Sequence, residues 1–172
     1  MKRHILLVGL PGSGKTTVGR IVAEQLGAAF VDIDNTIVRK MQMPIVRIFA
    51  EFGESKFREV EHETMVTTLE GPPSVISPGG GWSAQGGQLE LARPTCLTIY
   101  LRLMAMTAAK RISGEGSRPL LVGEDPVEKM RTLLKDREPF YQQAECEVKC
   151  DIQSPEQIAA QVIALARERG GW

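Results

Sequence analysis

The chain has 172 residues, of which 42% are hydrophobic, and its 21 lysines and arginines are balanced by 21 aspartates and glutamates. A net charge of zero argues against nucleic acid or an acidic membrane as the main partner, because such ligands require an excess of positive charge. No apolar run approaches the 18 residues of a membrane span, and the N-terminal run is too short for a signal peptide, so we expect a cytoplasmic protein of one domain.

The first expected element is a buried strand at residues 5–8, which leads through the sequence GLPGSGKT at 9–16 into a helix at 17–26. A strand, a loop and a helix in this order are the setting that the GxxxxGK[ST] phosphate-binding loop requires. Its glycines let backbone amides and the positive end of the helix face a phosphate. Lys15 reaches the β- and γ-phosphates, and the Thr16 hydroxyl is placed to bind Mg²⁺. The expected ligand is a nucleoside triphosphate with magnesium, bound by Gly12, Ser13, Gly14, Lys15, Thr16 and Thr17.

Two acidic residues, Asp32 and Asp34, follow the second expected strand at 29–31. Ligands of open α/β sheets bind beside the carboxyl ends of the strands, which favours a functional role for this pair. The alternative is a structural one, in which Asp34 or Asn35 caps the helix expected at 36–41.

Two more helices are expected at 44–52 and 54–69, with a break at Gly53. Arg58 and Glu61 are one turn apart on the second of them. Helix geometry alone slightly favours a surface ion pair for these two side chains, worth only a few tenths of a kcal/mol.

A strand at 74–77 leads into three consecutive glycines, Gly79, Gly80 and Gly81, and then Trp82. A run of glycines is typical of backbone that approaches another group closely, although a flexible loop remains the alternative. Trp82 either lines a pocket or covers the core.

The remaining chain continues the alternation, with helices expected at 88–92, 104–112, 126–143 and 155–169 and strands at 95–101 and 146–150. The glycine-rich segment 113–119 reads as a lid whose Arg118 adds positive charge on closure. Residues 170–172 are expected to be a frayed tail. Cys96, Cys146 and Cys150 form no CxxC pair and lie in strand-like runs, which favours buried free thiols.

Five short buried strands separated by helices predict an α/β fold, a five-stranded parallel sheet with helices on both faces. We expect a single domain over 1–172, with substrate-binding helices at about 33–62 and a mobile lid at about 112–124. The ligand cleft should open at the carboxyl ends of the strands.

In its ordered motifs the chain resembles the shikimate kinase family, which belongs to the nucleoside monophosphate kinase-like P-loop proteins. The similarity extends from Leu7 to about Tyr141. Besides the phosphate loop and the paired aspartates, it rests on Phe57, Arg58 and Glu61, on the three glycines, on Arg118 through Leu121, and on Arg137, Pro139 and Tyr141. Trp82 and the segment 85–87 depart from the usual pattern, which has a small residue after the glycines and Asn-Arg soon afterwards.

The resemblance implies transfer of the γ-phosphoryl group of ATP to the 3-hydroxyl of shikimate, a step in aromatic amino acid (chorismate) biosynthesis. It implies that Arg58 and Arg137 hold the shikimate carboxylate, that Asp34 binds the ring hydroxyls and that Gly80 offers its amide. Lys15, Asp34 and Arg118 would be catalytic, Asp32 would join Thr16 at the magnesium, and Arg111 would stack on adenine. We expect a monomer.

Two alternatives stay open at this stage. One is a kinase of the same scaffold that uses both arginines for another anionic acceptor, such as gluconate. The other is a nucleotide-binding module without turnover, which has no evident need for Asp34, Arg58 and Arg137.

Overall fold

The computed structural model describes residues 1–114 and 125–172. Five strands form one parallel sheet in the order β2-β3-β1-β4-β5, which confirms the predicted fold class. The strands are β1 (His4–Val8), β2 (Ala29–Asp32), β3 (Ser74–Ser77), β4 (Cys96–Arg102) and β5 (Cys146–Lys149). Every residue of β1 is buried, as expected for the central strand of a sheet covered on both faces.

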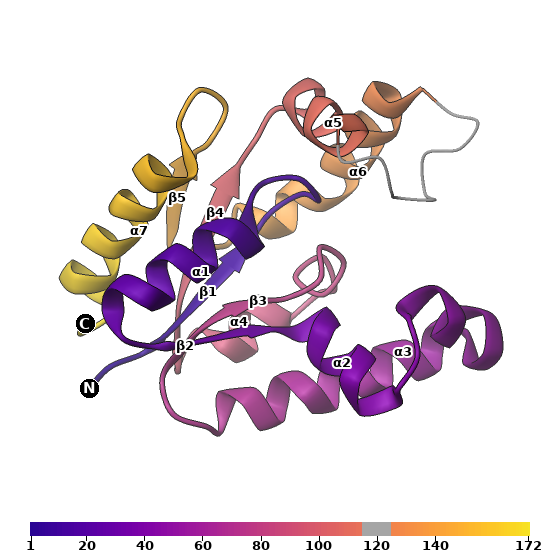
Figure 1. Ribbon diagram of the computed structural model, residues 1–172, viewed down its shortest axis with the longest axis horizontal. Helices are drawn as coiled ribbons and strands as arrows, with labels where there is room; N and C mark the ends of the chain where they lie inside the picture. Colours follow the sequence, from indigo (N-terminus) through magenta and orange to yellow (C-terminus); the bar gives the residue numbers. More distant parts are fainter. Residues whose placement is uncertain (115–124) are drawn as a thin grey trace.

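The helices cover the two faces of this sheet (Figure 1). They are α1 (Lys15–Leu26), α2 (Ile33–Met41), α3 (Ile45–Leu69), α4 (Gln88–Ala92), α5 (Ala105–Gly114), α6 (Pro126–Tyr141) and α7 (Pro155–Arg169). Helices α1 and α7 pack side by side on one face. The chain moves from β1 to β2 in one direction along the sheet and from β3 to β4 in the other, so right-handed crossovers place α1 and α4 on opposite faces. The adjacent ends of β1 and β3 are therefore a switch point, where open sheets of this kind bind ligands.

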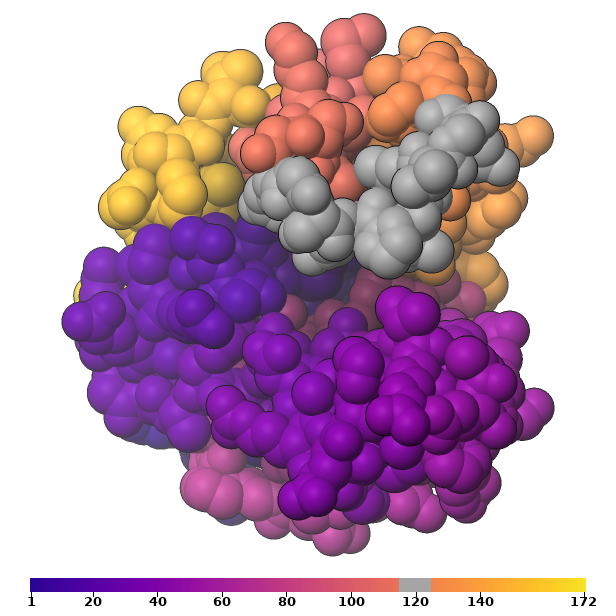
Figure 2. Space-filling view, turned by 45° about the vertical axis from the view of Figure 1, so that its right-hand side comes forward, coloured from indigo at the N-terminus to yellow at the C-terminus, as the bar shows by residue number. Residues whose placement is uncertain are grey.

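Helix α3 contains the predicted break at Gly53, whose torsions are φ 81° and ψ 169°. This region of backbone space is essentially restricted to glycine, so the residue separates two helical segments. Helix α3 packs with α2, partly through a contact between Lys40 and Glu63 of the second segment, which also carries Arg58 and Glu61. The space between the α2–α3 segment and α6 is hollowed on the molecular surface (Figure 2).

The start of α2 differs from the expected start at residue 36, and the alternative of a cap at Asp34 or Asn35 does not hold. The helix begins at Ile33, directly after β2, and Asp32 is its N-cap, with the side chain accepting a hydrogen bond from the Asn35 amide. The prediction was wrong because the strand passes into the helix without a linker.

The prediction of a frayed C-terminus was also wrong. The indole Nε1 of Trp172 donates a hydrogen bond to the Arg3 carbonyl at 2.9 Å, and the Lys2 ammonium lies 4.5 Å from the ring centroid. The tail therefore packs against the chain that enters β1, and the two termini lie close together (Figure 1).

The three cysteines are free, as predicted, and Cys96 and Cys150 are buried, whereas Cys146 is only partly buried because it lies on the edge strand β5. Burial raises the pKa of the Cys96 thiol to about 11 and that of Cys150 to about 12. These thiols stay protonated near neutral pH, which makes them poor nucleophiles. Among the described residues, no helix combines the length and apolar character needed to cross a bilayer.

Candidate active site

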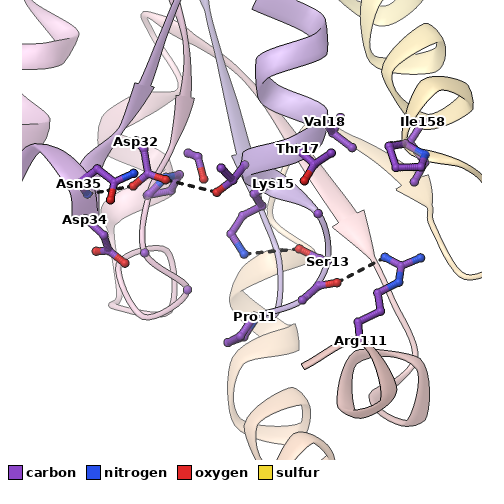
Figure 3. A pocket seen from close by; sticks show the side chains of 18 of the residues that line it. Pro11, Ser13, Lys15, Thr17, Val18, Asp32, Asp34, Asn35, Arg111 and Ile158 are labelled. Carbon is purple, nitrogen blue, oxygen red and sulfur yellow. Dashed lines mark hydrogen bonds between the residues drawn. The ribbon is translucent and has the colours of Figure 1, made fainter. Parts of the chain in front are cut away.

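A pocket of about 770 Å³ opens at the carboxyl ends of the central strands (Figure 3). It brings together eleven of the residues singled out from the sequence. They are Gly12, Ser13, Gly14, Lys15, Thr16, Thr17, Asp32, Asp34, Gly79, Gly80 and Arg111. Gly81 does not line this cavity, but it belongs to the same loop as Gly79 and Gly80, and Arg58 and Arg137 lie beside that loop. Arg118 is outside the described residues, as is most of the predicted lid; residues 112–114 form the end of α5.

The phosphate loop places Lys15 at the mouth of the pocket. Gly14 adopts a left-handed conformation with φ 91° at the N-cap of α1, which turns the chain sharply into the helix. The Lys15 ammonium donates hydrogen bonds to the carbonyls of Gly9 and Leu10 at 2.8 and 2.9 Å. The ammonium and the N-terminus of α1 both lie at this pocket, and both favour an anion there.

The carboxylate of Asp32 is fixed by two hydrogen bonds. Its Oδ2 accepts from the Thr16 hydroxyl at 3.2 Å, and its Oδ1 accepts from the Asn35 amide at 3.0 Å. A hydroxyl beside a carboxylate is a hard oxygen donor set of the kind Mg²⁺ accepts, and this ion typically needs only one or two protein groups besides phosphates and water. The described part of the chain holds no cluster of three or more His, Cys, Asp or Glu suited to a metal. The Thr16 hydroxyl and the Asp32 carboxylate are the groups that fit magnesium bound with a triphosphate.

None of the three glycines after β3 has a positive φ, so backbone conformation does not explain why glycine is present. The side chains that lie next to them do. A Cβ on Gly79 would lie 2.9 Å from Asp34 Oδ1, one on Gly80 would lie 3.1 Å from Arg137 Nη1, and one on Gly81 would lie 2.8 Å from Arg58 Nη2. Real Cβ atoms essentially never approach other atoms closer than 3.0 Å, so a side chain at Gly79 or Gly81 would push the Asp34 or Arg58 side chain aside, and one at Gly80 would crowd Arg137. The loop thus meets the three charged side chains expected to bind the acceptor. This geometry favours close approach over the flexible-loop alternative.

Arg58 is held by Glu61 in a partly buried pair. Its Nη1 lies 2.7 Å from Glu61 Oε2, and the Glu61 side chain is only 1% exposed. Glu54, at 3.6 Å from Nη2, is exposed and adds a weaker contact. The expectation of a surface ion pair was wrong, because the second segment of α3 turns this face toward the interior. One edge of the guanidinium is used by Glu61, while Nη2 faces the glycine loop.

Arg137 is positioned by Tyr141, one turn further along α6. The Tyr141 hydroxyl donates to the Gly80 carbonyl at 2.9 Å. Burial raises the pKa of Tyr141, although the hydrogen-bonded Arg137 beside it acts in the opposite direction. The phenol therefore stays protonated and remains a donor to the loop.

Arg111 borders the opposite end of the pocket. Its guanidinium donates to the carbonyls of Gly12 and Cys150, at 3.3 and 2.9 Å, which ties α5 to the phosphate loop and to the end of β5. Gln153, Pro155 and Ile158 line the same cavity (Figure 3). The sequence analysis missed all three as site residues. Their only sequence signal was the start of the last helix, which carries no ligand information.

Trp82 is 2% exposed and belongs to the hydrophobic core, which settles its role as a core residue. It does not line the pocket. Its indole anchors the loop that carries the glycines.

A five-stranded parallel sheet with a phosphate loop at the switch point between β1 and β3 defines the P-loop kinase fold. Residues 11–167 match the family model described as shikimate kinase. The chain belongs to the shikimate kinase family, and it is therefore an ATP-dependent kinase.

Individual relatives agree with this assignment. A shikimate kinase from Moorella thermoacetica is 37% identical over 94% of this chain and 93% of its own. The structure of shikimate kinase from Acinetobacter baumannii in complex with shikimate superposes with a TM-score of 0.90 at 33% identity, covering 98% of this chain and 94% of that one. A gluconokinase from Sinorhizobium meliloti, at 17% identity, covers 99% of this chain and 94% of its own with a TM-score of 0.67, and shows the shared fold alone.

Proposed function

We propose that this chain transfers the γ-phosphoryl group of ATP to the 3-hydroxyl of shikimate, forming shikimate 3-phosphate on the way to chorismate and the aromatic amino acids. The observation that carries the proposal is the glycine loop, which meets Asp34, Arg137 and Arg58 through three successive residues. The same loop borders the pocket that holds the phosphate loop. A site for an organic acid thus adjoins a site for a triphosphate.

At the donor end, residues Gly12 to Thr17 bind the phosphates of ATP through backbone amides and the Lys15 ammonium. Thr16 and Asp32 would hold magnesium, directly or through water, and the ion would supply positive charge that neutralises the triphosphate. Arg111 stacks on the adenine, for which a planar guanidinium is well suited. Gln153, Pro155 and Ile158 form the adjoining wall of the base site.

At the acceptor end, Arg58 and Arg137 bind the carboxylate of shikimate. A guanidinium–carboxylate contact is charge-assisted, directional and worth roughly 1.5 to 3 kcal/mol. Gly79, Gly80 and Gly81 let these side chains approach the loop, and the amide of Gly80 adds a donor to the ligand. Asp34, against Gly79, binds ring hydroxyls.

Catalysis in this scheme is mostly positioning and charge stabilisation, because phosphoryl transfer has a loose transition state. Asp34 orients the 3-hydroxyl and accepts its proton as the new oxygen–phosphorus bond forms and the bond from the γ-phosphorus to the bridging oxygen of ADP breaks, so that ADP leaves. Lys15 and Arg118 stabilise charge on the transferring group. The assignment of Arg118 rests on the sequence motif alone.

The function is tested with purified protein in a coupled assay of ADP release, using shikimate, quinate and gluconate as acceptors. We expect turnover with shikimate only, dependent on Mg²⁺ and abolished in Lys15→Ala. Phosphorylation of gluconate but not shikimate would support the alternative kinase, and nucleotide binding without turnover on any acceptor would support a binding module.

We further infer that the protein acts as a cytoplasmic monomer without nucleic-acid or membrane partners. Its balanced net charge supports the part of this inference that concerns nucleic acid and acidic membranes, since such partners favour proteins with an excess of positive charge. Light scattering coupled to gel filtration tests the monomer.

A further inference from the structure

Gln85 lies in the loop between β3 and α4 and has no part in the motifs or the mechanism described above. Its side-chain amide donates to two groups at once, to Glu61 Oε2 at 3.2 Å and to the Gly81 carbonyl at 3.3 Å. The first contact joins the loop to α3, over a sequence separation of 24 residues. The second stays within the loop.

These contacts close a ring of interactions around Arg58. The guanidinium donates to Glu61, Glu61 also accepts from Gln85, and Gln85 donates to the Gly81 carbonyl. Arg58 Nη2 closes the ring, because it lies so near Gly81 that a Cβ there would be 2.8 Å from it. We propose that Gln85 is a positioning residue for shikimate, which fixes the Arg58 guanidinium against the glycine loop through Glu61 and Gly81. The inference rests on the proposed role of Arg58 in binding the shikimate carboxylate.

The chemistry of a buried carboxylate explains why a neutral amide donor suits this position. Glu61 is 1% exposed and, among the described residues, accepts hydrogen bonds at Oε2 only, from Arg58 and Gln85. A buried charge depends strongly on each donor it has. A second cation at position 85 would compete with Arg58 for this carboxylate, whereas an amide leaves the ion pair with Arg58 intact.

The fold of the loop itself has other supports. The Trp82 amide donates to the Gly79 carbonyl, the Gln85 amide donates to the Trp82 carbonyl, and the Trp82 side chain is 2% exposed in the core. The side-chain amide of Gln85 is therefore not needed for the turn itself, and its two hydrogen bonds serve to hold Glu61 and the Gly81 carbonyl. Removing it should alter how Arg58 is held more than whether the loop folds.

The test compares Gln85→Leu with the matched control Gln88→Leu. Gln88 starts α4, three residues further on, and its side chain makes no hydrogen bond among the described residues. In Gln85→Leu we expect the Kd and KM for shikimate to rise roughly five- to tenfold, with the KM for ATP within about twofold of the parent value. Gln88→Leu should leave both unchanged. An unchanged shikimate Kd in Gln85→Leu, or an equal loss of ATP affinity, would overturn the inference.

A second variant, Gln85→Glu, gives a readout that a purely structural role would not produce. It places a new carboxylate beside Glu61, with Arg58 and Glu54 as the other charged groups of this cluster. Two adjacent carboxylates repel each other when both are charged, and protonation of the introduced acid relieves the repulsion and restores a donor in place of the amide. The ratio of variant to parent KM for shikimate should rise with pH between about 6 and 8.5, and a pH-independent ratio would contradict the proposal.

Arg58→Ala distinguishes the proposed role of Arg58 in shikimate binding from the proposed role of Gln85 in positioning Arg58. If the parent enzyme phosphorylates shikimate and Arg58→Ala loses shikimate affinity while Gln85→Leu does not, the role of Gln85 is wrong and the proposed function stands. If Arg58→Ala binds shikimate normally, the acceptor assignment itself fails.

Discussion

Gly80 is constrained by the side chain that passes over it and by the phosphate loop beside it. A Cβ there would lie 3.1 Å from Arg137 Nη1 and 3.4 Å from Pro11 Cδ. We expect Gly80→Ala to displace the guanidinium and weaken shikimate binding on the order of tenfold, or about 1.4 kcal/mol. Gly86→Ala is the control, because a Cβ at that position meets nothing within 4 Å. Calorimetric titration with shikimate measures the effect, and equal affinities for the two variants would refute the explanation of this glycine.

Tyr141 acts on the same glycine from the other side, through the hydrogen bond from its hydroxyl to the Gly80 carbonyl. Tyr141→Phe leaves that carbonyl without its donor, so we expect a loss of about 1 kcal/mol in the free energy of unfolding and a weaker shikimate affinity. Tyr100→Phe is a matched comparison. The Tyr100 ring stacks on Tyr141 at 5.3 Å, but its hydroxyl donates to Glu138 rather than to the loop. In urea unfolding and ligand titration, Tyr100→Phe should lower stability alone; a matching fall in shikimate affinity would count against the role of the Tyr141 hydroxyl.

At the scale of elements, one residue joins β2, α1 and α2. Asp32 ends the strand, caps α2 and accepts from the Thr16 hydroxyl at the start of α1. Asparagine caps helices about as well as aspartate, whereas alanine loses about 1 kcal/mol. Asp32→Asn should therefore keep the melting temperature but need more Mg²⁺ for half-maximal activity. Asp32→Ala should have a lower melting temperature and also need more Mg²⁺. Thermal melts and Mg²⁺ titrations of activity separate the two roles; a parental Mg²⁺ requirement in Asp32→Asn would exclude Asp32 from the metal site.

The elements that the sequence predicted well are those whose signals are local. Short strand-like runs marked the five strands, although the edge strands β2 and β5 are only partly buried rather than buried as expected. Gly53 marked the break in α3, and the phosphate loop was identified by its own spacing and context. The cap of α2 was misplaced by two or three residues because nothing in the sequence indicates that a strand passes directly into a helix. Helix periodicity also predicted that Arg58 and Glu61 form an ion pair on the surface. That prediction failed because periodicity within one helix does not indicate which of its faces is covered by a loop from elsewhere in the chain.

At the scale of the whole molecule, the contacts that escaped prediction join segments far apart in the chain. The Trp172 indole donates to the Arg3 carbonyl across 169 positions of the sequence. Gln153, Pro155 and Ile158 line the pocket although they lie more than a hundred positions after the phosphate loop. The side-chain roles in substrate binding and catalysis stay predictions, and Arg118 with the lid lies outside the described residues.

His4 is another residue whose role only the tertiary structure reveals. It is 3% exposed on β1. Its Nδ1 accepts from the Ser74 amide of β3 at 3.2 Å, so the ring proton is on Nε2, which lies 3.3 Å from the Leu69 carbonyl. Burial lowers the pKa of His4, although the contact with Leu69 acts in the opposite direction. The neutral ring thus bridges two central strands and the end of α3.

The sign of the resulting pH dependence follows from linkage. Above the ordinary histidine pKa of about 6.5, His4 is neutral in both the folded and the unfolded chain and stability is at its full value. As the pH falls below that value, the unfolded chain takes up a proton that the folded chain resists, so the free energy of unfolding decreases until the lowered folded pKa is passed. His4→Gln should be less stable at pH 7.5 but lose less on acidification to pH 5.5 than the parent. His62→Gln, a change at an exposed histidine, should follow the parent curve. Urea unfolding between pH 5.5 and 7.5 measures the free energy of unfolding of the three proteins. Parallel pH curves for parent and His4→Gln would show that the buried imidazole does not cause the loss of stability at low pH.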